Sequence, residues 1–431
     1  MKKTISFLLL LAVCFSLSAQ QRRNNRNDAP CGFGTPSCNS SSFSDRFRNK
    51  SGGNNLLVKY KLQYIHGFII PHSDRVEPLI DKNTNGVEFA VEFPKYGGKP
   101  WHFYYAFPTT GLAVQYLDLG NPDLLGSAFT FYPYIIIPIF QKPMFSFNFK
   151  LGAGISYLTE KYDPEKPHTY DENNYAIGSH LNGFLCGGLN TEILFSRSQR
   201  SFISRFSFVA DASLHHISNG SIQKPNAGLN MFNAGIGLKY IPYLTIAPMK
   251  QKSARIERKW SLEPVLGFGV NQQNEFDEKK YFNGSLSVGG YRPLGNTYRF
   301  GLNMDMFYNS AFHSERTLPD YYAGINGKFR MGFSLANELM FGDFATGVHI
   351  GGYALNPIEH DGYVYFKLVA KYRVYDHFFV NLALKTHMQV AESIELGVGY
   401  SLSKTEKAPY SWIPEKKKLE KKKKKKDKGE Y

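Results

Sequence analysis

The amino-acid sequence predicts an all-β fold, a transmembrane antiparallel β-barrel of about sixteen strands. Aromatic residues make up 15% of the chain, mostly Phe and Tyr, and glycine is abundant. Many segments alternate apolar with polar side chains, as barrel strands do when one face meets lipid and the other a polar lumen. Convincing helical periodicity is absent. No segment beyond the N-terminus offers the ~20 uninterrupted apolar residues of a transmembrane helix.

The N-terminal segment is typical of a secretory signal peptide. Two lysines precede an apolar run from Ile5 to Val13, and small residues near Ala19 offer a cleavage site. The run is too short to span a bilayer as a helix. We therefore expect residues 1–19 to be removed, together with Cys14, and the mature chain to reach the outer membrane.

The two ends of the mature chain are polar and basic. Residues 20–53 form a Gly-, Ser-, Asn- and Arg-rich arm that we expect to be flexible, and residues 411–431 a lysine-rich periplasmic tail. These ends and the signal peptide carry most of the formal charge of +15. The predicted barrel is therefore nearly neutral, which argues against nucleic acid as a partner. Contact of the tail with anionic head groups is an alternative to a solvated tail.

The remaining cysteines do not indicate a metal site. Cys31 and Cys38 lie in the flexible arm, where a disulfide between them is the less favoured alternative, and Cys186 lies in a predicted strand. The sequence has no CxxC pair, no other plausible metal cluster and no phosphate-binding glycine loop. We therefore expect no metal and no cofactor.

The candidate strands follow one another from residue 55 onward. They begin near Asn55, Gly86, Trp101, Ser127, Met144, Gly178, Ser201, Asn230, Lys259, Tyr281, Thr297, Ile325, Phe344, Gly362, His377 and Ser393. Connections after even-numbered strands are mostly tight, such as residues 141–143 and 342–343. Those after odd-numbered strands are longer, such as 159–177 and 311–324. Outer-membrane barrels have short periplasmic turns and long outer loops, so both termini are predicted in the periplasm.

Two arrangements fit this pattern of strands. We favour one sixteen-stranded barrel, with residues 54–245 as its first half and 246–410 as its second. The alternative is an eight-stranded barrel followed by a second eight-stranded barrel. The connector at residues 243–258 is long and basic, without the Gly/Ser composition of an interdomain linker, and strand quality continues unchanged across it.

One polar motif, HHISNGSIQKPNAGLN at residues 215–230, joins the seventh and eighth candidate strands. Successive side chains of a strand point to opposite faces, so His216 and Ser218 share the apolar, lipid-facing side. Asn230 begins the next strand on the same face. His215 faces the lumen, where a structural role is expected. The motif thus gathers polar groups at the outer end of an apolar wall.

These residue types fit ester hydrolysis by a serine nucleophile. Such a reaction needs a base beside the hydroxyl and a donor for the developing oxyanion. Residues 216 and 218 are spaced for a His–Ser hydrogen bond, and Asn230 can reach the second imidazole nitrogen. The alternative is that these side chains cap the strand and that the Asn-rich segment is turn chemistry.

The pattern His216-x-Ser218-Asn219, followed by Asn226 and by position 230, resembles the lipid A 3-O-deacylase (PagL-type) outer-membrane enzymes over residues 55–245. The resemblance implies an eight-stranded barrel with the site on its lipid-facing wall. It also implies His216 as general base, Ser218 as nucleophile, and Asn219 and Asn226 as oxyanion or orienting groups. The family usually has an acidic residue where this chain has Asn230, which can orient the imidazole but adds no charge.

The resemblance and the chemistry together predict a carboxylic ester hydrolase of the lipid A deacylase or acyloxyacyl hydrolase type. It would remove an ester-linked acyl chain from the lipid A of lipopolysaccharide. The expected partners are this substrate, the outer membrane and the barrel-assembly machinery. The alternative is a non-catalytic outer-membrane barrel, a channel or scaffold, that carries a relic active site.

Overall fold

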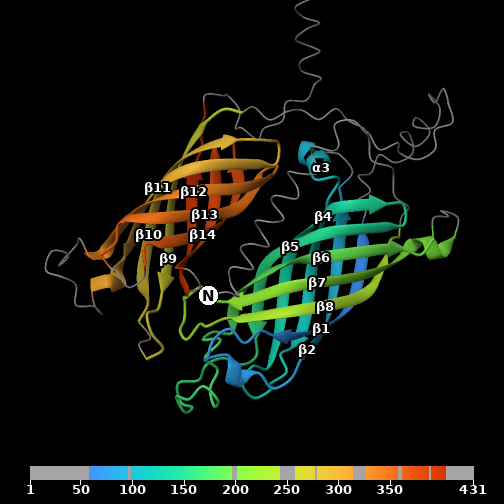
Figure 1. The fold of residues 1–431 in the computed structure, drawn as a ribbon, viewed down its shortest axis with the longest axis horizontal. Helices are drawn as coiled ribbons and strands as arrows, with labels where there is room; N and C mark the ends of the chain where they lie inside the picture. The colour runs from blue at the N-terminus through green and yellow to red at the C-terminus, as the bar shows by residue number, and fades with distance from the viewer. Residues whose placement is uncertain are drawn as a thin grey trace, which may run out of the picture.

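The computed structural model describes residues 58–95, 99–196, 201–242, 258–276, 279–313, 327–357, 362–387 and 390–403. These residues form two closed β-barrels that lie beside each other (Figure 1). The predicted signal peptide, the arm with Cys31 and Cys38, and the lysine-rich tail lie outside the described residues. Most of the connector between the barrels does as well.

The N-terminal barrel contains eight antiparallel strands, coloured blue to yellow-green in Figure 1. They are β1 (Lys59–Ile69), β2 (Thr84–Pro94), β3 (Thr109–Asp118), β4 (Ser127–Lys142), β5 (Phe145–Leu158), β6 (Leu181–Leu194), β7 (Phe206–Ser218) and β8 (Leu229–Tyr240). Each strand pairs with the next, and β1 pairs with β8 from Tyr60↔Tyr240 to Ile69↔Met231. The barrel therefore closes on itself.

The C-terminal barrel repeats this plan. Its strands are β9 (Ser261–Asn271), β10 (Tyr281–Pro293), β11 (Tyr298–Asn309), β12 (Phe329–Phe341), β13 (Phe344–Leu355), β14 (Val364–Tyr375), β15 (Phe378–His387), β16 (Val390–Tyr400) and the two-residue β17 (Leu402–Ser403). Closure comes from β9, which pairs with β10 on one side and with β16 and β17 on the other.

The preferred prediction of one sixteen-stranded barrel is therefore wrong, and the tandem alternative is confirmed. Strand alternation was unable to distinguish them, because both arrangements use the same strand directions and leave no open edge. In a barrel of only eight strands, side chains can fill the interior completely. The first and last strand of each half meet within that half.

Two strand starts also differ from the sequence prediction. Residues near Trp101 form the short helix α3 (Pro100–Tyr104), with Pro100 in the first turn, where a missing N–H costs nothing. The strand expected from Ser201 begins only at Phe206, after the 3-10 helix η2 (Phe202–Arg205). None of the helices in the described ranges is long and apolar enough to cross a membrane.

The strands alternate as predicted, with polar side chains inside and apolar side chains outside. In the N-terminal barrel a network of ion pairs fills the lumen. It contains Lys59, Lys61, Lys150 and Lys239, paired with Glu88, Glu92, Glu192 and Asp211. The equal number of positive and negative side chains explains how so many charges can be buried together. Cys186 is a buried free thiol on β6.

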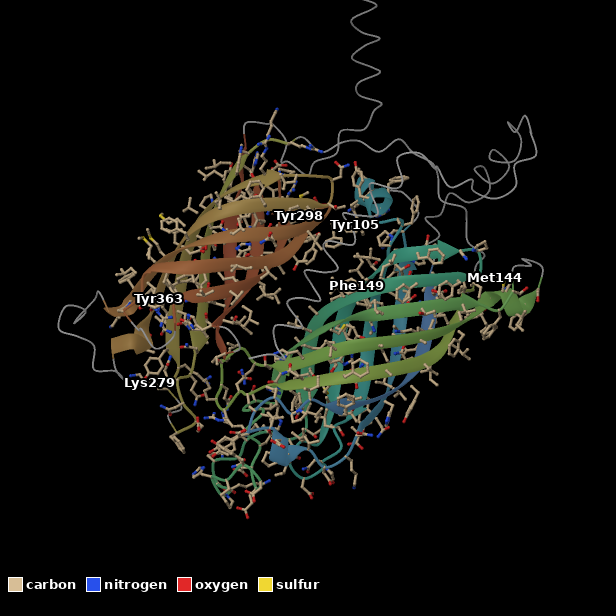
Figure 2. All side chains as sticks on the ribbon, in the orientation of Figure 1. Tyr105, Met144, Phe149, Lys279, Tyr298 and Tyr363 are labelled. Atoms are coloured by element: carbon tan, nitrogen blue, oxygen red, sulfur yellow. The ribbon has the colours of Figure 1, made fainter. Side chains whose placement is uncertain are left out.

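The lumen of the C-terminal barrel is filled in the same way. Arg299 binds Glu263 and Glu338, and Lys371 lies 2.9 Å from Glu338. Asp305 accepts from Lys367, Ser334 and Tyr365. The inward direction of these charged side chains agrees with the predicted alternation, which places polar residues in the lumen. Figure 2 shows the side chains on the inner and outer faces of the two barrels.

An apolar cluster closes the N-terminal barrel at the end that carries the loop between β7 and β8. It combines strand residues such as Ile65, Ile217 and Leu229 with loop residues such as Leu79 and Ile177. The loops after β1 and β5 are thereby held against the loop between β7 and β8. This packing fixes the backbone around the HHISN motif.

Candidate active site

The polar residues of the motif meet where β7 ends and β8 begins. The antiparallel register places His216 directly opposite Asn230 and Ile217 opposite Leu229. Odd-numbered residues of β7 are buried in the lumen, so His216 and Ser218 project from the outer wall. On β8, Asn230 shares the outward face with Phe232. The structure therefore brings together all three residues that the sequence singled out for catalysis.

These three side chains form a continuous hydrogen-bonded chain. Nδ1 of His216 lies 2.7 Å from Oδ1 of Asn230, and Nε2 of His216 lies 2.9 Å from Oγ of Ser218. A carboxamide oxygen can only accept, so Nδ1 carries the imidazole proton. Nε2 is then the acceptor for the hydroxyl of Ser218. The tautomer is the one that a general base beside a serine requires.

The site is largely shielded from water. Ser218 is 8% exposed, and its neighbour Asn219 is 3% exposed. His215 points the other way, into the lumen, where Nε2 lies 3.0 Å from Oγ of Ser213. The predicted division between an outward His216 and an inward His215 is confirmed.

Asn219 organises the loop that follows the serine. Its Nδ2 donates to Oγ of Ser179 at 2.9 Å and to the carbonyl of Gln223 at 2.8 Å, which uses both of its N–H groups. Its Oδ1 accepts from the backbone N–H of Gln223 at 3.3 Å. The side chain of Asn219 is thus fully engaged within the loop.

Asn226 lies across the same loop from Asn219. Its Oδ1 accepts the backbone N–H of Asn219 at 3.0 Å. This bond fixes the orientation of the Asn226 carboxamide, and among the described residues its Nδ2 has no hydrogen-bond partner. Asn226 can therefore offer an N–H donor beside the serine.

Gly228 permits a close approach of the backbone to the imidazole. Its φ of +78° is unfavourable for other residues, and a Cβ there would lie 3.1 Å from Cε1 of His216. The backbone N–H of Gly228 also donates to the carbonyl of Ala176 at 2.9 Å. The glycine in the motif therefore has a steric reason as well as a hydrogen bond.

Sequence reasoning missed several residues that support the site. His72, in the loop after β1, has Nε2 3.2 Å from the carbonyl of Ala227. Ser179, in the loop after β5, anchors Asn219. Both residues contact backbone or amide groups that are distant in the sequence. No short-range spacing of residues in the sequence therefore identifies them.

The loop carries buried positive charge. Burial lowers the pKa of Lys224, and the nearby positive charge of Arg75 lowers it further. Arg75, in the loop after β1, also packs over the ring of Tyr170, 5.9 Å from its centroid. These three loop residues, here called the outer rim, combine two cations with one aromatic ring.

Two family models match the chain. Residues 85–239 match lipid A 3-O-deacylase (PagL), and residues 260–404 match the acyloxyacyl hydrolase C-terminal domain. The matches correspond to the two barrels and together cover well over half of the chain. No curated protein matches.

Three solved structures illustrate the similarity of the chain to known structures. A triple mutant of the Rhodopseudomonas blastica porin is 7% identical, over 80% of this chain and 99% of that one, with a TM-score of 0.17. OmpF of Salmonella typhi with daunomycin is 8% identical over 80% and 96%, with a TM-score of 0.16. CdiB from Acinetobacter baumannii is 10% identical over 80% and 60%, with a TM-score of 0.16. Scores this low carry no argument about fold or function.

Proposed function

Since the chain belongs to the lipid A 3-O-deacylase (PagL) family, hydrolases that act on acyl esters of lipid A, we propose that it is an outer-membrane serine esterase. It removes one ester-linked acyl chain from the lipid A of lipopolysaccharide. The observation that carries the proposal is the hydrogen-bonded chain Ser218–His216–Asn230 on the outer wall of the barrel.

The first step is attack of Oγ of Ser218 on the ester carbonyl carbon. As the new C–O bond forms, Nε2 of His216 takes the hydroxyl proton, and the carbonyl oxygen becomes an oxyanion. Collapse of this intermediate breaks the bond to the sugar oxygen, which leaves with the proton held by His216. Water, deprotonated by His216 in turn, then hydrolyses the acyl-serine and restores the hydroxyl.

Asn226 is proposed as the oxyanion donor. Its Oδ1 is held by the backbone N–H of Asn219, which leaves Nδ2 available as the donor to the developing charge. Asn219 acts as a positioning residue, since its own side chain is engaged with Ser179 and Gln223. Removal of one such donor typically lowers turnover by about 10²- to 10³-fold.

Asn230 is proposed as the orienting group of a weakened triad. In the serine-protease template, Asp→Asn lowers turnover by ~10⁴, because the imidazole adopts the wrong tautomer. Here Oδ1 of Asn230 faces Nδ1 of His216, which keeps the productive tautomer. What the amide lacks is the negative charge that would stabilise imidazolium.

The position of the site suits a substrate that arrives within the membrane. The serine lies at the end of β7 on a wall whose outward residues include Phe208 and, on β8, Ile236 and Leu238. Apolar surface of this kind favours acyl chains and lipid. In this proposal the signal peptide directs export, the barrel-assembly machinery inserts the barrels, and lipid A diffuses laterally to the serine.

A non-catalytic barrel with a relic site is the second candidate, and the amide at position 230 is the observation that favours it. Ser218→Ala and His216→Ala decide between the two. In cells with either variant, mass spectrometry should show that lipid A keeps the hydroxyacyl chain that the wild-type protein removes. Heat-modifiable migration of the barrel should stay normal. Undiminished deacylation by the serine variant would end the nucleophilic mechanism. Unmodified lipid A in cells with the wild-type protein would favour the relic.

A further inference from the structure

The loop between β7 and β8 is held from the C-terminal barrel as well as from its own. Oγ of Ser221 donates to the carbonyl of Ala391 on β16, and the backbone N–H of Gln272 donates to the carbonyl of Ser221 at 2.9 Å. Ser221 is only 2% exposed and has a φ of +70°. These bonds join a catalytic loop to strands that lie more than fifty residues further along the chain.

Gln272 and Lys280, which flank the connection between β9 and β10, make the other bonds. Oε1 of Gln272 accepts the backbone N–H of Lys224 at 3.1 Å and Nζ of Lys280 at 3.0 Å. The same Nζ donates to the carbonyl of Ile222 at 2.6 Å. One buried amide and one ammonium group thus hold two backbone groups of the loop, the N–H of Lys224 and the carbonyl of Ile222. A side-chain substitution in the loop leaves both backbone groups in place.

Packing reinforces these bonds. Gly220, with a φ of +62°, lies against Ile394 of β16, and a Cβ at position 220 would lie 2.3 Å from Cγ1 of that isoleucine. Cδ1 of Leu384, on β15, would lie 3.4 Å from the same added Cβ. The outer wall of the C-terminal barrel therefore forms an apolar seat for the loop.

We propose that the C-terminal barrel is a positioning element of the active site, with Gln272 and Lys280 as the positioning residues. This inference rests on the proposed function. Residues 220–224 connect Ser218 and Asn219 to Asn226. The hydrogen bonds of Gln272 and Lys280 to this segment, together called the clamp, therefore set the distance between the nucleophile and the oxyanion donor. A misplacement of about 1 Å in such a site can cost ~10²-fold in rate.

The clamp acts on the transition state more than on substrate binding. In this proposal the acyl chains of the substrate bind the apolar outer wall of the N-terminal barrel, which Gln272 and Lys280 do not contact. The oxyanion contact from Asn226 is made only as charge develops. Loss of the clamp should therefore lower kcat and leave KM nearly unchanged.

The test uses the full-length protein, purified in detergent and assayed on lipid A. Gln272→Leu removes the amide acceptor, and Lys280→Met removes the ammonium donor at similar side-chain length. Each should lower kcat by about 10- to 100-fold with KM within about twofold of wild type. Lys280→Arg keeps the donors and should retain most of the activity.

A matched control lies at another contact between the barrels. Oη of Tyr105, just after α3, donates to the carbonyl of Thr297 at 3.1 Å, and its ring stacks on Phe341 (centroids 4.4 Å apart). Figure 2 labels Tyr105 next to Tyr298 of the other barrel. Tyr105→Phe also removes one inter-barrel hydrogen bond, away from the serine, and should leave kcat unchanged.

The outcomes separate the two proposals. Wild-type kcat in both Gln272→Leu and Lys280→Met, with Ser218→Ala inactive, overturns the clamp and leaves the esterase proposal standing. An equal loss in Tyr105→Phe also overturns it, because general docking of the barrels would then be sufficient. Activity in Ser218→Ala overturns the esterase itself. Heat-modifiable migration verifies folding, and the rate at which a fluorophosphonate labels Ser218 gives a second measure, which should fall in the clamp variants.

Discussion

The two barrels share one plan, and their seventh strands differ on the outer face. In the N-terminal barrel the seventh strand, β7, ends with His216 and Ser218 facing outward. The seventh strand of the C-terminal barrel, β15, presents Leu382 and Leu384 on its outer face, and Leu384 packs near the catalytic loop. The outer face of the seventh strand is polar and hydrogen-bonded near its end in one barrel, and in the other it supplies an apolar support for the catalytic loop.

This difference separates structural polarity from functional polarity. Both lumens contain buried ion-pair networks, around Glu88 in the first barrel and Glu338 in the second. A feature that both barrels share is best explained by the need to fill and neutralise a closed interior. The hydrogen-bonded polar chain on an otherwise apolar outer wall has no such structural explanation, and that is why we assign it to chemistry in the proposed function.

The largest effect is expected from the lumen charges. Glu88→Gln removes the nearest carboxylate of Lys61 and Lys150, which leaves Asp211 at 4.0 Å from each. Glu338→Gln removes one of the two carboxylates that pair with Arg299 and Lys371, and leaves Glu263. Each should lower the free energy of unfolding by about 3 to 5 kcal/mol, since the two buried cations are then left to share a single carboxylate. Urea unfolding in detergent measures this loss. If only one of the two variants were destabilised, the equivalence of the lumens would be wrong.

A smaller loss is expected from charges on the outer walls. Ile236 on β8 and Leu302 on β11 are outward and near mid-strand, 57% and 60% exposed. Ile236→Arg and Leu302→Arg should each cost about 2 to 4 kcal/mol when the protein is folded into liposomes, because arginine then meets lipid. If these walls faced water instead, the same substitutions would leave the free energy of unfolding almost unchanged. A cost for Ile236→Arg alone would mean that the C-terminal barrel does not span the membrane.

The smallest effect concerns the residue that distinguishes the outer wall most sharply. Asn230→Glu supplies the negative charge that the amide lacks and should raise turnover near neutral pH by about tenfold, equivalent to ~1.4 kcal/mol. Steady-state deacylation of lipid A measures it, with Asn230→Gln as the matched uncharged control. A fall in turnover with intact folding would mean that the site is tuned to an amide.

Local properties of the chain were readable from the sequence. A period of two residues places His216 and Ser218 on one face whatever the rest of the barrel does, and it separates them from His215. The inward direction of Asp305, Arg299 and their neighbours follows from the same period. Strand-to-strand register then brings Asn230 to the imidazole, because a short-range antiparallel pair needs only the two adjacent strands.

Only the tertiary structure decided the features that depend on distant residues. Whether β1 closes on β8 or on β16 depends on which edges meet in space, and alternation is identical in both cases. His72, Ser179 and Gln272 support the site through backbone carbonyls, N–H groups and amides, which every residue or many residues can offer. Their roles arise from where closed barrels and folded loops place them, and no spacing in the sequence encodes that placement.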